Sequence, residues 1–157
     1  MDDFTRFIED TLKRDNPVIV IVTESHRSSL FQRLKAHGWD IPAAIQKGSY
    51  ISLDVSDTLS KFMVNDWPDS SRFAKVVGDL IKGAAKAAEG KHAQVAACGE
   101  CGPALWALGK AEAAIQVAHL WDEIADIHDV NTLCGYLGSR PPSKGKIPGA
   151  DDYGKAG

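Results

Sequence analysis

The sequence lacks the long apolar runs and the leader that would tie it to a membrane. No run approaches the ~20 apolar residues that span a bilayer, and the opening Met-Asp-Asp-Phe has neither the basic nor the apolar region of a signal peptide. Cysteine is scarce too, at three residues, which fits reduced thiols better than a disulfide framework. We therefore expect a cytoplasmic protein without membrane contact.

An excess of positive charge is also missing. The 18 basic and 21 acidic residues are well mixed along the chain and give a formal net charge of −3. Neutralisation of phosphates by Lys and Arg supplies most of the affinity of proteins for nucleic acids. We therefore expect no direct binding of nucleic acid by this chain.

The usual nucleotide-binding loops are absent. The pattern G-x-x-x-x-G-K-[ST] is not completed, because neither Gly-Lys pair, at 109–110 or at 145–146, is followed by Ser or Thr. A G-x-G-x-x-G dinucleotide fingerprint is missing as well. We expect no cofactor, since no glycine-rich loop is present to hold its phosphates.

What the chain does have is a buried strand that ends in polar residues. With 157 residues, 44% of them hydrophobic, it suits one domain with a sizeable core. Residues 17–27 read Pro-Val-Ile-Val-Ile-Val-Thr-Glu-Ser-His-Arg. A run that is apolar on both faces is typical of an inner strand in a parallel sheet covered by helices.

The remaining pattern predicts an alternation of helices and strands. Helices are expected over 3–14, 24–37, 41–46, 70–89 and 103–128, the last weakened at Gly109, with a short helix and a loop over 56–68; strands are expected over 17–23, 50–55, 94–98 and 131–136. The predicted fold is a three-layer α/β domain over 1–137, with a mainly parallel sheet of four or five strands and helices on both faces. The Pro/Gly-rich residues 138–157 are predicted to be a flexible tail.

Polar residues follow three of these strands. Parallel α/β sheets bind ligands at the carboxyl ends of their strands. Glu24 and Glu100 follow two different strands, so they either converge on one crevice or each stabilises the dipole of the following helix. The full set expected near this edge is Thr23, Glu24, Ser25, His26, Asp54, Cys98 and Glu100.

The cysteines and His26 leave several chemistries open. Cys98-Gly-Glu-Cys101 lies between a strand and a helix, as redox dithiols do, but small buried thiols are the favoured interpretation, and a zinc site would also need Cys134 and a histidine. His26 is either a solvated or capping residue or a base. Since there is no G-x-S-x-G elbow, no catalytic residue and no metal ligand is assigned.

Five segments together carry a family resemblance: 16–27, 34–41, 50–54, 99–100 and 132–136. In this order and spacing they resemble the MEDS family, the sensory domain of methanogens and methylotrophs associated with the repressor DcmR. Such domains look like RecA/KaiC-type ATPases without the phosphate-binding loop. Members usually have one more strand, bearing a histidine, before the first helix and a helix after the last strand, so the resemblance implies a shortened form with an open sheet edge and a homodimer.

The resemblance implies a non-catalytic sensory domain in signal transduction. Its ligand would be a small molecule such as a hydrocarbon derivative, and its partner a histidine kinase or a transcription regulator, as in two-component systems. Two alternatives stay open: a divergent ATPase-like enzyme that uses Glu24 and Glu100, and a protein–protein interaction module. The residues expected to bind the ligand are Thr23, Glu24, Ser25, His26, Asp54, Cys98, Glu100, Cys134 and Tyr136, with Cys98 and Cys134 on the apolar side.

Overall fold

A computed structural model describes residues 2–88 and 94–134, and this part of the chain contains seven helices and six strands. In chain order they are α1 (Asp2–Lys13), β1 (Val18–Val22), α2 (Glu24–Ala36), α3 (Ile41–Lys47), β2 (Tyr50–Asp54), α4 (Val55–Phe62), β3 (Met63–Val64), β4 (Trp67–Pro68), α5 (Ser70–Ala87), β5 (Ala96–Gly99), α6 (Cys101–Ala107), α7 (Ala111–His128) and β6 (Asn131–Cys134). The predicted tail, residues 138–157, lies outside the described residues, as does the end of the predicted strand 131–136. Among the helices that are described, none is long and apolar enough to cross a membrane.

The central sheet has four parallel strands in the order β2-β1-β5-β6. All five residues of β1 are fully buried, which confirms the inner strand predicted from its apolar run. Val20 pairs with Ser52 of β2 on one side and with Cys98 of β5 on the other. β1 is therefore an inner strand of the sheet, with β2 on one side and β5 on the other.

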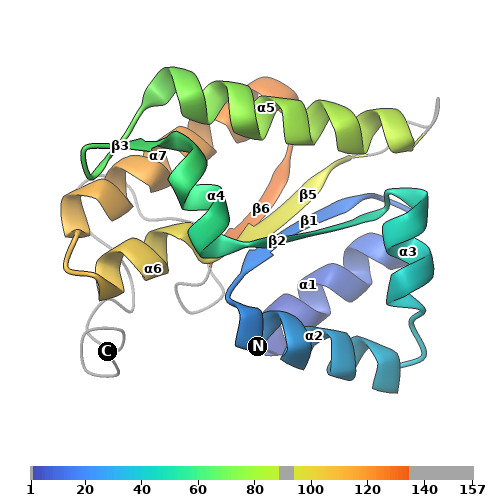
Figure 1. Cartoon of the computed structure of the whole chain (residues 1–157). Helices are drawn as coiled ribbons and strands as arrows, with labels where there is room; N and C mark the ends of the chain where they lie inside the picture. The colour runs from blue at the N-terminus through green and yellow to red at the C-terminus, as the bar shows by residue number, and fades with distance from the viewer. Residues whose placement is uncertain (1, 89–93, 135–157) are drawn as a thin grey trace.

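Helices cover both faces of this sheet, which confirms the three-layer prediction (Figure 1). Val18, Val20 and Val22 of β1 pack with α1, α2 and α3 on one face. Ile19 and Ile21 pack with α4, α5, α6 and α7 on the other. Alternate side chains of a strand point to opposite faces, so one short β-branched run supplies the centre of two separate cores.

The connections from β1 and β5 diverge. The chain leaves β1 through α2 and α3 on one face and returns in β2, on one side of β1. It leaves β5 through α6 and α7 on the other face and returns in β6, on the opposite side. The carboxyl ends of β1 and β5 thus flank a topological switch point, which is where open α/β sheets form their ligand crevices.

Polar side chains begin four of the helices. Thr23, Asp40, Asp54 and Asp69 each accept a hydrogen bond from a backbone N–H in the first turn of α2, α3, α4 and α5. These bonds satisfy donors that have no partner within the helix. Thr23 is the N-cap of α2, and its hydrogen bond places the next residues at the switch point.

Two segments differ from the prediction. The loop expected before α5 is an antiparallel hairpin of β3 and β4, turned by Asn65 and Asp66 at φ values of 52° and 64°. Two left-handed residues in succession are typical of a type I′ turn, but strands of two residues are too short to show a periodicity. The helical region expected over 103–128 is divided into α6 and α7, because Gly109 adopts a φ of 78° between them.

Candidate functional site at the switch point

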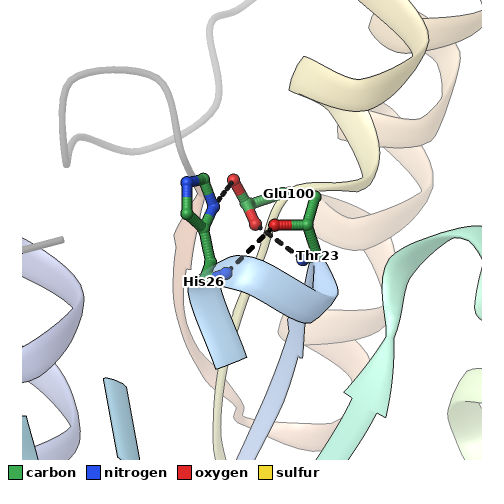
Figure 2. Close-up of polar contacts among 3 residues, drawn as sticks. All are labelled: Thr23, His26 and Glu100. Atoms are coloured by element: carbon green, nitrogen blue, oxygen red, sulfur yellow. Dashed lines mark hydrogen bonds and ion pairs between the residues drawn. The ribbon is translucent and has the colours of Figure 1, made fainter. Parts of the chain in front are cut away.

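Thr23 connects β1 to the ligand edge of the sheet. It follows the last buried valine in an extended conformation, and its Oγ1 accepts the backbone N–H of His26 at 3.3 Å (Figure 2). This bond turns the chain from strand to helix within one residue. The side chain of His26 is thereby carried on the first turn of α2, where it faces the end of β5.

Glu100 joins the two strand ends across the switch point. It is 5% exposed, and its Oε1 accepts the backbone N–H of Thr23 at 3.0 Å, while its Oε2 lies 2.7 Å from Nδ1 of His26 (Figure 2). An ionised carboxylate can only accept, so Nδ1 of His26 donates the proton. We call Thr23, His26 and Glu100 the switch-point contact. Each charge-assisted hydrogen bond of this kind contributes about 1.5–3 kcal/mol.

A close approach of the two strands makes this contact reachable. The backbone N–H of Glu100 donates to the carbonyl of Ile21 at 2.9 Å. At Gly99 a Cβ would lie only 3.3 Å from both the Cβ and the carbonyl oxygen of Ile21. Glycine at this position therefore lets β5 end against β1 and aims the glutamate across the gap.

The other polar residues predicted for the site lie outside this contact. Glu24 is exposed and pairs with Arg27 of its own helix at 2.7 Å, and Ser25 is exposed as well. Asp54 caps α4 by accepting the N–H of Asp57. Glu24 and Glu100 therefore have different partners, and Glu24 lies in the first turn of α2 as the dipole interpretation requires. Glu100 makes no side-chain cap of α6.

The two described thiols face different layers. Cys98 is buried with the helices α1 to α3, and Cys101 is buried with α4 to α7. Burial raises the pKa of both thiols, that of Cys101 to about 12, and the charge of Glu100 adds to the effect. Protonated thiols are poor nucleophiles, which favours the buried-residue interpretation over the redox one. Tyr136 and the side chain of Cys134 lie outside the described residues.

A small apolar cavity lies behind the turn that carries Glu100. Its volume is about 40 Å³, and a single water needs about 10–15 Å³, so it has room for a molecule of a few atoms. Thr132 brings the one hydroxyl among its described lining residues. The lining residues are Ala97, Cys98, Gly99, Cys101, Gly102, Val117, Ala118, Trp121, Thr132 and Leu133.

The sequence singles out only one of the described lining residues. It predicts Cys98 on the apolar side of a ligand pocket, but it assigns Val117, Ala118 and Trp121 of α7 to no site. Their periodicity shows that α7 is amphipathic but does not show that it packs beside β6 and leaves a space there. Within residues 2–88 and 94–134 there is no group of three or more His, Cys, Asp or Glu residues that could hold a metal ion.

Comparisons with known proteins place the chain in a family. The sequence profile described as MEDS, the MEthanogen/methylotroph, DcmR Sensory domain, matches residues 1–145 of the 157. Searches of curated proteins and of solved structures returned no match. The profile covers the whole three-layer fold with its switch point and cavity. The chain therefore belongs to the MEDS family of sensory domains.

Proposed function

We propose that this domain senses a small apolar molecule, such as a hydrocarbon derivative, in the cavity behind the β5–α6 turn and relays its presence to α2. One observation carries the proposal. In the turn 99–102, Gly99, Cys101 and Gly102 line the cavity, while Glu100 between them holds Thr23 and His26. A ligand that contacts one side of this turn acts directly on the residue that anchors α2 on the other side.

The chemistry of the cavity supports an apolar ligand of limited size. Its walls are aliphatic and aromatic carbon, with the thiols of Cys98 and Cys101 held protonated by burial. Such a wall offers dispersion contacts and little hydrogen bonding, so a small hydrocarbon or halogenated hydrocarbon gains more by leaving water than a polar molecule does. Ordering of the glycine-flanked turn by a bound molecule would strengthen the switch-point contact, because both depend on the same backbone.

The first half of α2 suits the reading of this signal by a partner. Of its thirteen residues only Leu30 and Leu34 are buried, so the turns that follow Thr23 present polar side chains to solvent. A histidine kinase or a transcription regulator that binds this surface would respond to how firmly Glu100 holds it. The proposed role needs no catalytic group, and Glu24 and Glu100, on which the ATPase-like alternative relied, are each bonded to a different basic side chain.

Xenon tests the relay without knowledge of the natural ligand, because it enters small apolar cavities. Under xenon pressure, backbone amide NMR signals are expected to shift at residues 99–102 and also at Thr23 and His26. In a Glu100→Gln variant the shifts at the cavity should remain and those in α2 should shrink. Glu9→Gln in α1, which removes the carboxylate that binds His37 at the far end of α2, is the matched control and should change neither. Shifts confined to the cavity in the wild-type protein would refute the relay, and no shifts at all would refute the site.

A further inference from the structure

Two hydroxyl groups are buried without a hydrogen-bond partner on the face of the sheet that α1, α2 and α3 cover. In the part of the chain that the structure describes, Tyr50 Oη and Ser52 Oγ are the buried side-chain oxygens or nitrogens that lack one. Tyr50 is 1% exposed. Both belong to β2 and are two residues apart, so they point to the same face, toward α2. A buried polar group without a hydrogen-bond partner lowers the free energy of unfolding. Two such groups close together therefore need an explanation, and a ligand that accepts hydrogen bonds from them is one.

The first two turns of α2 form the roof over these hydroxyls. The ring of Phe31 packs edge-on against Tyr50 at 5.8 Å between centroids, which fixes where α2 crosses β2. Arg27 is one turn earlier than Phe31 on the same side of the helix. Burial raises the pKa of Tyr50, the neighbouring Cys98 adds to this effect, and the positive charge of Arg27 partly opposes it. The net pKa is raised, so the hydroxyl stays protonated and can donate a hydrogen bond.

The guanidinium of Arg27 has a carboxylate partner, Glu24, that another carboxylate could replace. Nη2 of Arg27 lies 2.7 Å from Oε1 of Glu24, and the side chain of Glu24 is 69% exposed. Exposed ion pairs of this kind hold weakly. Two other carboxylates at this edge of the sheet are engaged elsewhere: Asp54 accepts the N–H of Asp57, and Glu100 accepts from Thr23.

We infer that the space between β2 and the first two turns of α2 is a binding site for a small carboxylate. One carboxylate oxygen would accept from the hydroxyls of Tyr50 and Ser52, and the other would take the place of Glu24 on Arg27. Two hydroxyl donors beside a guanidinium match the two acceptor atoms of a carboxylate. Val20 is fully buried and pairs with Ser52 in the neighbouring strand. The side chain beside the two hydroxyls is therefore apolar, and it suits a ligand whose carboxylate carries a short apolar chain.

Binding requires the first turn of α2 to move outward, because both hydroxyls are covered. That turn contributes no buried side chain, and the contact that ties it to β5 is Glu100. The site shares no lining residue with the apolar cavity and goes beyond the proposed function, although both act on the same helix.

Thermal unfolding with formate, acetate and propionate, set against methanol, ethanol and propanol, tests this inference. The carboxylates should raise the unfolding midpoint of the wild-type protein and the alcohols should not. Tyr50→Phe and Ser52→Ala should weaken carboxylate binding about 10- to 100-fold, as for one lost hydrogen bond to a charged group. Glu24→Gln should tighten it by freeing Arg27. Ser49→Ala, which removes a hydroxyl that already donates to Ala44, is the matched control and should leave binding unchanged.

Stability without ligand separates a binding role from a structural one. Because its hydroxyl has no partner, Tyr50→Phe should raise the midpoint of the free protein by about 2–4 °C while it loses carboxylate binding. A lowered midpoint would show that the hydroxyl supports the fold and would overturn the inference. So would a wild-type protein that ignores carboxylates, responds equally to alcohols, or binds carboxylates as well after Tyr50→Phe and Ser52→Ala. The xenon response does not involve Tyr50, so failure here leaves the apolar relay standing.

Discussion

Two glutamates in this domain make nearly the same contact at opposite ends of α2. At the switch point, Glu100 binds Nδ1 of His26 at 2.7 Å and the backbone N–H of Thr23. At the other end, Glu9 of α1 lies 3.1 Å from Nδ1 of His37 and accepts the indole N–H of Trp39 at 3.0 Å. We call Glu9, His37 and Trp39 the helix-end contact.

The difference between them lies in what they connect. The helix-end contact joins two helices of one layer, and its glutamate side chain is 18% exposed. The switch-point contact joins the ends of two strands whose connections lie in different layers, and its glutamate side chain is 6% exposed. The same pair of residue types therefore fixes a helix end in one place and couples two halves of the sheet in the other. Position in the topology decides which.

Removal of each carboxylate should give the largest contrast. We expect Glu100→Ala to lower the free energy of unfolding by about 3–5 kcal/mol, because a buried, hydrogen-bonded charged group is lost and its partners are left unsatisfied. Glu9→Ala should cost about 1–2 kcal/mol, since its partners can turn to water. Urea unfolding at neutral pH measures both. The exposed Glu24→Ala is the control, within about 0.5 kcal/mol of wild type. Equal losses from Glu100→Ala and Glu9→Ala would remove the distinction.

A glycine lies beside each contact, Gly99 at the switch point and Gly38 at the helix end. Substitution of these glycines by alanine should give the second-largest difference in stability. Gly99→Ala would place a methyl group 3.3 Å from the backbone oxygen of Ile21, an overpacking expected to cost about 1–3 kcal/mol. Gly38→Ala meets no atom within 4 Å and suffers only from its φ of 92°, at about 1 kcal/mol. Thermal unfolding of both, with Gly83→Ala in the open face of α5 as a control, ranks them. If Gly99→Ala lowered the unfolding midpoint no more than Gly83→Ala does, the close approach of β5 to β1 would not require glycine at this position.

The smallest expected effect concerns pH. Burial raises the pKa of Glu9, but the hydrogen bonds from Trp39 and His37 outweigh it and leave the pKa lowered. A lowered folded-state pKa means that the stabilisation is present above the unfolded value of about 4.3 and is lost as pH falls through the folded value. The difference in unfolding free energy between wild type and Glu9→Gln, about 1 kcal/mol at pH 6, should therefore shrink toward zero below pH ~4. A difference that grew on acidification would contradict this sign.

The strand ends could be predicted from sequence because local patterns determine them. Each of these features can be recognised within a few residues of sequence: the apolar run of β1, the caps at Thr23 and Asp69, and Glu100 next to Gly99. Since parallel strands end at one edge, even the meeting of residues 74 positions apart, His26 and Glu100, follows from the fold class.

The helix-end contact and the cavity could not be predicted in this way. Glu9 is separated from Trp39 by 30 residues, and their meeting depends on how α1 packs beside α2, for which charge patterning along one helix gives no signal. The cavity depends on the distance between α7 and β6, which side-chain volumes set collectively. The pairing of Glu24 with Arg27 is likewise not visible in the sequence, because which way a first-turn side chain points depends on the partner nearest to it.

The placement of Cys98 and Cys101 on opposite faces of the sheet has a consequence for unfolding kinetics. Cys98 packs with α1 to α3 and Cys101 with α4 to α7, and both also line the apolar cavity. A bulky alkylating reagent that does not fit this cavity can reach each thiol only when the layer that covers it opens. Labelling of Cys98 reports the lifting of α1 to α3, and labelling of Cys101 reports the lifting of α4 to α7. The two natural thiols can therefore time the opening of the two layers separately, without any introduced probe.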